Sequence, residues 1–114
     1  MKTYYLFLRD DPQALAAISP ADMQAIVEKY VRWREENASR VSGGEKLKDG
    51  EGVVLRRRGS ALERADGPFV EAREILGGYF VAQAESLADA EALARTCPHL
   101  DFGSIEIREM EPTD

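Results

Sequence analysis

The sequence predicts one α+β domain over residues 1–114, with a ferredoxin-like antiparallel sheet and two helices on one face. Residues 3–8 and 75–82 are apolar at nearly every position, which is typical of central strands covered on both faces. Each run is followed by a helix start of the same pattern (serine, any residue, alanine, aspartate) at 19–22 and 86–89. A strand–helix–strand unit used twice builds a ferredoxin-like sheet with both helices on the same face.

The two predicted helices are amphipathic, with apolar residues at three-to-four spacing. The first runs from Pro20 to about Ser39, and the second follows Ser86 and is stopped by Pro98. The residues predicted to be buried are Met23, Ile26, Val27, Tyr30, Trp33 and the stem of Arg34 on the first helix, and Leu87, Ala90, Leu93, Ala94 and Cys97 on the second.

The remaining strands lie in more polar stretches. A short strand is expected around Glu45–Lys48, and residues from Val53 to Arg64 are expected to form a hairpin that turns at Gly59-Ser60. Residues Ser104–Arg108 alternate strictly between apolar and polar, so the last strand has one buried face and one polar face.

The two central strands predict an association between copies of the chain. Both strands are apolar on the face that the two helices do not cover. A second copy of the sheet is the simplest cover for such a face, so we expect a homodimer through the sheet face.

Charge and cysteine content argue against several classes of protein. The net charge of −6 disfavours a nucleic-acid binder and attraction to an anionic membrane surface. Arg56, Arg57 and Arg58 follow one another on a predicted strand, so they point to alternate faces and form no single basic patch. The single cysteine permits no internal disulfide, which fits a reducing compartment. No stretch reaches transmembrane length, and we expect a cytoplasmic protein.

Two segments carry a resemblance to a known family. Asp66-Gly67-Pro68-Phe69 matches the signature of the DGPF group, and residues 69–79 resemble its acidic run before leucine, paired glycines and an aromatic. Cys97-Pro98-His99-Leu100 and residues 105–108 resemble the C-terminal block of the same proteins. The chain is therefore similar to YCII-related proteins of the DGPF type over nearly its whole length.

The resemblance implies a ferredoxin-like fold, a homodimer joined through its sheets as a dimeric α/β barrel, and a pocket near the dimer cleft. It also implies a weak genomic association with extracytoplasmic-function sigma factors, and it brings no settled reaction. Other YCII-like proteins are proposed to use a histidine on the first helix together with an aspartate. The first helix predicted here has no histidine, and the only histidine is His99.

His99 and Asp66 are the candidate catalytic residues. A histidine titrates near neutral pH, which suits proton transfer, although His99 could instead only stabilise a helix C-terminus. Asp66 stands in a tight-turn signal, where it either shapes the turn or presents a carboxylate to a pocket.

Candidate ligand contacts surround these two residues in the same half of the chain. Paired glycines inside a strand indicate close approach of a ligand or of a partner backbone. Arg108 offers a planar fork for an anion and Glu106 shares its strand face, although a solvated face is the alternative for both. The candidate ligand-binding residues are Gly67, Pro68, Phe69, Gly77, Gly78, Glu106 and Arg108.

Cys97 and its neighbours are predicted to hold no metal or other cofactor. Cys97 continues an apolar helix stripe, and a helix C-terminus disfavours a thiolate, so core packing is expected. Cys97, His99 and Asp101 are metal-ligand types, but the sequence has no further cysteine or histidine to complete a closed zinc site.

Two functions stay open, and the sequence does not decide whether the protein is an enzyme. In the first, a lyase or isomerase acts on a small anionic metabolite held by Arg108 in a dimer-cleft pocket, and His99 or Asp66 moves a proton. In the second, the same pocket belongs to a non-catalytic binding or regulatory module, including one linked to sigma-factor regulation.

Overall fold

A computed structural model describes residues 1–67 and 74–112 of the chain. Its body is an antiparallel sheet of four strands in the order β2-β5-β1-β6. The strands are β1 (Lys2–Asp10), β2 (Val41–Lys46), β5 (Ile75–Ala84) and β6 (Gly103–Glu109). The two strands predicted to be central, β1 and β5, lie side by side in the middle. The predicted α+β antiparallel architecture is confirmed, and it agrees with a ferredoxin-like fold.

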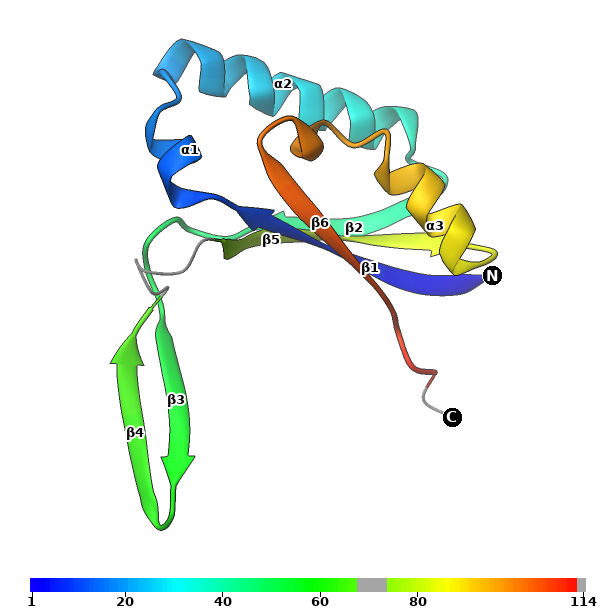
Figure 1. The fold of residues 1–114 in the computed structure, drawn as a ribbon. Helices are drawn as coiled ribbons and strands as arrows, with labels where there is room; N and C mark the ends of the chain where they lie inside the picture. The colour runs from blue at the N-terminus through cyan, green and yellow to red at the C-terminus, as the bar shows by residue number, and fades with distance from the viewer. Residues whose placement is uncertain (68–73, 113–114) are drawn as a thin grey trace.

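The helices all lie on one face of the sheet (Figure 1). Both predicted helix starts are confirmed, because the hydroxyls of Ser19 and Ser86 each accept a backbone N–H three residues later at 3.1 Å. None of the described helices is long and apolar enough to cross a membrane. The helices are α1 (Pro12–Ala16), α2 (Pro20–Glu36), α3 (Leu87–Ala94) and a 3-10 turn, η1 (Pro98–Asp101).

Helix α1 is an addition to the two predicted helices. The side chain of Asp11 accepts hydrogen bonds from the backbone N–H groups of Gln13 and Ala14, at 2.9 and 3.4 Å. Pro12 occupies the first turn, where its missing N–H costs nothing. An Asp-Pro pair directly after a strand is also a turn signal, so the sequence does not predict the five-residue helix α1.

The core lies between the sheet and the helices α2 and α3. Leu6 and Leu8 of β1 pack with Trp33, and the rings of Trp33 and Phe80 lie 5.1 Å apart between centroids. The Trp33 Nε1–H donates to the hydroxyl of Thr96 at 2.8 Å, which ties α2 to the end of α3. The buried hydrophobic residues are Tyr4, Leu6, Leu8, Trp33, Val41, Phe80, Ala82, Ala84, Ala90, Leu93, Ala94 and Cys97.

Three residues predicted to be buried are exposed instead. Val27 is 50 % exposed because the stripe that meets the sheet runs through residues 23, 26, 30 and 33, one position away. Leu87 is 57 % exposed because it opens α3 before that helix reaches the core. Arg34 lies beside the same stripe and is also exposed.

The predicted hairpin is confirmed and forms a separate two-stranded sheet, here named the arm. Its strands are β3 (Val53–Arg58) and β4 (Ala61–Asp66), with a turn at Gly59, where φ is 58°. The backbone N–H of Gly67 donates to the carbonyl of Gly52 at 2.9 Å and closes the base of the arm. The arm hangs from one end of the body, on the side of the sheet away from the helices (Figure 1).

Strand β2 starts earlier than the predicted strand around Glu45–Lys48. It begins at Val41, whose side chain is buried, and runs through Gly43 and Gly44. A side chain at Gly44 would meet the Tyr79 carbonyl at 2.5 Å and the Phe80 ring at 2.6 Å. Both glycines therefore lie inside the sheet, and Gly44 lets β2 approach β5 closely.

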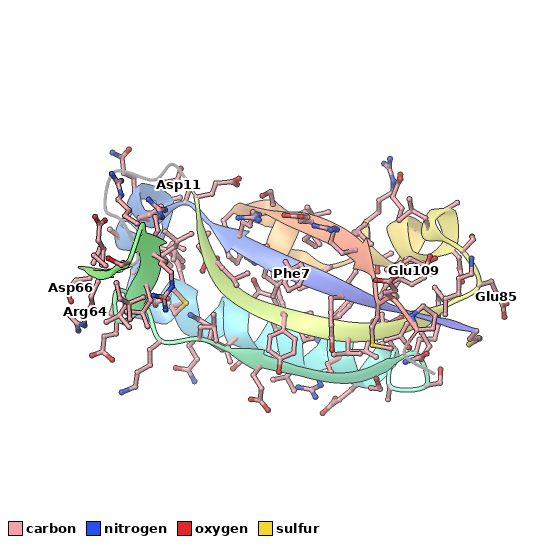
Figure 2. The ribbon with its side chains drawn as sticks, turned by 90° about the horizontal axis from the view of Figure 1, so that it is seen from below. Phe7, Asp11, Arg64, Asp66, Glu85 and Glu109 are labelled. Atoms are coloured by element: carbon pink, nitrogen blue, oxygen red, sulfur yellow. The ribbon has the colours of Figure 1, made fainter. Side chains whose placement is uncertain are left out.

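The second face of the sheet, here named the open face, carries aromatic residues that no described helix covers. Figure 2 shows this face from below, with Phe7 near its middle. The ring of Tyr5 lies 5.8 Å from that of Phe7 and 6.2 Å from that of Tyr79, measured between centroids. The predicted two-faced apolar character of β1 is therefore present in the structure.

Candidate functional site

Asp10 and His99 are the two buried polar residues that the described chain places together. Asp10 ends β1 and is 4 % exposed, and His99 lies in η1 and is 2 % exposed. The Asp10 Oδ1 atom is 3.7 Å from the His99 Nε2 atom, close enough for electrostatic attraction but too far for a hydrogen bond. Buried groups of this kind are costly unless they are partnered.

Both ring nitrogens of His99 have hydrogen-bond partners. Nε2 lies 2.8 Å from the backbone carbonyl of Arg9, and Nδ1 lies 2.6 Å from the Tyr30 hydroxyl. A carbonyl only accepts, so Nε2 carries a proton, and when the ring is neutral Nδ1 accepts the Tyr30 O–H. Burial raises the pKa of Tyr30 far above its ordinary value, which keeps this phenol a donor. The ring is thus fixed in one tautomer.

Among the described residues, Asp10 has fewer partners than His99. Burial raises the pKa of its carboxyl group, and the opposing attractions of His99 and Lys46 are weaker. Among the described residues, no side chain or backbone N–H donates a hydrogen bond to this carboxylate. A carboxyl group with a raised pKa beside a histidine is the kind of group that enzymes use to move protons.

Two glycines make the space in which this pair sits. A Cβ atom at Gly77 would overlap the carboxylate of Asp10, and a Cβ atom at Gly103 would overlap the Arg9 carbonyl and His99 Nε2. Gly77 stands where the register between β1 and β5 shifts, after Leu8. At Gly78 a Cβ atom would instead lie 2.8 Å from the Glu45 carbonyl of β2. The chain itself therefore explains the predicted glycine pair.

Glu106 and Arg108 lie on the opposite face of the sheet from this pair. In the register of β1 and β6, Glu106 faces Phe7 and Arg108 faces Tyr5, both on the open face. Glu106 accepts hydrogen bonds from Arg9 at 2.5 Å and from Arg108 at 3.2 Å, and these bonds lower the pKa of its carboxyl group. The structure therefore does not bring Arg108 to His99, because the sheet separates them.

The signature residues lie on or beyond the arm. Asp66 ends β4, its side chain is 86 % exposed, and it pairs with Arg64 at 3.0 Å (Figure 2). Gly67 is buried and closes the base of the arm. Pro68 and Phe69 lie outside the described residues. No contact in the described chain joins Asp66 to His99.

Asp10 and Tyr30 are the site residues that the sequence reasoning missed. A usable signal exists for Asp10, because it continues the alternate positions Tyr4, Leu6 and Leu8, all of which are buried. A charge in line with three core residues indicates a buried carboxylate. For Tyr30 the sequence offers only an apolar stripe, which is equally typical of plain core packing.

Cys97 behaves as a core residue, as expected. It is 3 % exposed, and burial raises the pKa of its thiol to about 11, so little thiolate exists at neutral pH. Within residues 1–67 and 74–112, no cluster of three histidine, cysteine, aspartate or glutamate side chains has the geometry to hold a metal ion.

Comparisons with known proteins place the chain in a family. The sequence profile of the YCII-related domain matches residues 2–114. The chain belongs to the YCII-related family. No curated protein matches its sequence.

Among solved structures, the protein resembles 5-chloro-2-hydroxyhydroquinone dehydrochlorinase (TftG) from Burkholderia phenoliruptrix AC1100, in complex with 2,5-dihydroxybenzoquinone. The TM-score is 0.57 at 11 % identity, and the match covers 96 % of this YCII-related chain and 93 % of the other. At this identity the likeness shows a shared fold.

The steric role of Gly77 predicts a coupling with Asp10. We expect Gly77→Ala to destabilise the protein by about 1–3 kcal/mol, because the new methyl group overpacks against the carboxylate. In an Asp10→Ala background the cost should fall by at least about 0.5 kcal/mol. Urea unfolding of the four proteins measures this. Gly43→Ala is the control, since its Cβ would meet only Val81, at 3.9 Å. If Gly77→Ala lowers the free energy of unfolding equally in both backgrounds, the proposed steric contact with Asp10 is wrong.

The raised pKa of Asp10 predicts a pH dependence of stability. The folded state favours the protonated carboxyl group, so this stabilisation is complete below the unfolded value near 3.8 and is lost as pH rises through the higher folded value. Asp10→Asn, which is neutral throughout, should therefore be more stable than the parent at pH 7 and similar to it at pH 3. Asp66→Asn is the exposed control and should leave the stability unchanged at pH 7 and at pH 3. The pKa assignment is wrong if Asp10→Asn is less stable than the parent at pH 7.

Proposed function

We propose that this YCII-related protein is a lyase or isomerase for small anionic molecules, in which the Asp10 carboxylate takes up and returns a proton. One observation carries the proposal. A carboxyl group with a raised pKa is buried at the end of the central strand, beside a histidine held in one tautomer. A raised carboxyl pKa brings a proton acceptor closer to neutral pH, where acid–base catalysis is most effective.

His99 is a positioning residue in this proposal, because its two nitrogens are already bonded to Arg9 and Tyr30. The His99 Nε2 atom lies 3.7 Å from the Asp10 Oδ1 atom, and the attraction between the two side chains favours the ionised carboxylate. Asp10 replaces Asp66 as the proposed carboxylate, since Asp66 is exposed and paired with Arg64 on the arm.

Lys46 supports an anionic substrate at this end of the sheet. In the sheet register Lys46 and Leu8 both pair with Gly78, so Lys46 belongs to the same face as Asp10. Its charge acts on the Asp10 carboxyl group, and its side chain is 64 % exposed and pairs with Asp49 at 2.7 Å, so an anionic substrate would take the place of Asp49. An exposed cation beside a proton acceptor can hold the anionic group of a small substrate.

The likeness to TftG supports the reaction class. That protein is a dehydrochlorinase, and removal of hydrogen chloride from a small ring takes away one proton. A carboxylate in Asp10's position can accept such a proton. The shared fold supports a small-molecule lyase as a class, and the substrate of this chain is a separate question.

We also propose that the protein is a homodimer joined through the open face. The support is a row of half-buried aromatic and aliphatic residues on β1 and β5 that no described helix covers. Apolar faces of this kind on soluble proteins mark association sites. Glu106 and Arg108 lie on the same face, so in this proposal they contact the partner and take no part in proton transfer.

A non-catalytic binding or regulatory module is the alternative, and it too has support. Asp10 and His99 are almost fully buried, and the ring of His99 has no free nitrogen. In this alternative the pair only fixes the end of β1 against α2 and η1, and a ligand is sensed without turnover.

A ligand screen followed by turnover separates the two functions. A thermal-shift screen of small anionic metabolites, with 2,5-dihydroxybenzoquinone as one probe, should give a compound that raises the melting temperature. For a compound that turns over, Asp10→Asn should lower kcat by at least about 100-fold, as expected for loss of a general base. Tyr30→Phe should lower it less, and Asp66→Asn is the exposed control. Binding without turnover in the parent favours the module, and full turnover by Asp10→Asn contradicts the assigned base.

The dimer proposal predicts that a charge on the open face separates the subunits. Phe7→Asp puts a carboxylate in the middle of the apolar face, where burial would be costly. Sedimentation equilibrium at micromolar concentration should give twice the chain mass for the parent and the chain mass for Phe7→Asp. Val27→Asp on the outer side of α2 is the control and should stay dimeric. A monomeric parent would exclude the homodimer.

A further inference from the structure

The arm has one face that is apolar and unused by the rest of the chain. In the register of β3 and β4, Leu55 pairs with Arg64 and Arg57 pairs with Leu62, so these side chains share a face with Val53. Val53 is 51 % exposed, and Leu55 and Leu62 are each 59 % exposed. This set, Val53, Leu55 and Leu62 flanked by Arg57 and Arg64, is named the apolar arm face.

The opposite face of the arm is more polar and carries one half-buried apolar side chain, Val54. There Arg58 and Glu63 form an ion pair at 3.1 Å, and Arg56 lies opposite Glu63. A two-stranded hairpin is at best marginally stable alone in water. A hairpin with large apolar residues on one face and no core of its own therefore requires a surface to pack against.

The accessible surface and radius of gyration of the chain indicate how much surface a partner could bury. Its accessible surface is 8071 Å² and its radius of gyration is 16.1 Å. A compact protein of this mass exposes about 6,200 Å² and has a radius of gyration of about 13 Å. The excess, about 1,900 Å², exceeds the roughly 800 Å² that each partner buries in a standard stable interface.

The direction of the arm and its charge indicate which partner fits. The arm hangs on the same side of the body as the open face, so a molecule seated on that face would lie against the arm (Figure 1). The arm, from Val53 to Asp66, has four arginines, one glutamate and one aspartate, a net charge of +2. The whole chain is −6, which leaves −8 for the remainder. A second copy offers this acidic body together with its own open face.

We propose that the apolar arm face clasps a second copy of this chain seated on the open face. Each arm then packs its three apolar residues against the partner's body, and Arg57 meets the partner's acidic surface, while Arg64 keeps its ion pair with Asp66. The inference rests on the homodimer proposed above and adds a second contact made by a different element.

Removal of the arm tests this contact directly. The hydrogen bond between Gly52 and Gly67 holds the two ends of the arm together, so residues 53–66 can be deleted and the ends joined. The point variants Leu55→Asp and Leu62→Asp change the apolar arm face alone. Ala61→Asp introduces the same charge on the opposite face and is the matched control. Circular dichroism confirms that each variant is folded, and analytical ultracentrifugation gives each dimer dissociation constant.

We expect the deletion, Leu55→Asp and Leu62→Asp each to raise the dimer dissociation constant about tenfold or more, and Ala61→Asp to leave it within about threefold. If the parent is dimeric and the deletion dimerises equally well, the clasp is wrong and the open-face dimer stands. If Leu55→Asp and Leu62→Asp have the same dimer dissociation constant as Ala61→Asp, the apolar arm face does not contact the partner. A parent that is monomeric at micromolar concentration overturns both proposals.

Discussion

The alternation of side chains along β1 is the constraint on which the rest of the structure depends. β1 pairs with β5 on one side and β6 on the other, so its side chains can only point to the two faces of the sheet. Tyr4, Leu6 and Leu8 go to the helix side and make the core, and Asp10 follows them in the same line. Tyr5, Phe7 and Arg9 go to the open face. A shift of one residue would exchange the two sets.

That alternation divides the candidate chemistry into two groups. On the helix side, Asp10 and His99 form a buried pair with one fixed tautomer and a raised carboxyl pKa. On the open face, Arg9, Glu106 and Arg108 form a charged cluster in which two arginines lower a carboxyl pKa. In the first group, burial raises the pKa of the Asp10 carboxyl group above its ordinary value. The second holds a stable negative charge, which suits a surface contact better than proton transfer.

The elements that the sequence predicts well are those set by local signals. Ser19 and Ser86 cap their helices through bonds three residues long, and the turn at Gly59 makes the hairpin. The site depends on tertiary information instead. Gly77 faces Asp10 only because the register of β1 and β5 shifts after Leu8, and no local pattern reports a shift. The chemistry of histidine makes His99 a candidate from the sequence, but its hydrogen-bond partners come from a strand and a helix far away in the chain.

Arg9 makes hydrogen bonds on both faces of the sheet. Its backbone carbonyl accepts the Nε2–H of His99 on the helix side, while its guanidinium donates to Glu106 on the open face. A partner seated on the open face would restrict the Arg9 side chain, and the same peptide positions the imidazole beside Asp10. Association and proton transfer would then act on one backbone segment, with no need for the partner to reach the buried pair. Arg9 has both roles because β1 is paired on both sides and Arg9 lies one residue before the end of this strand.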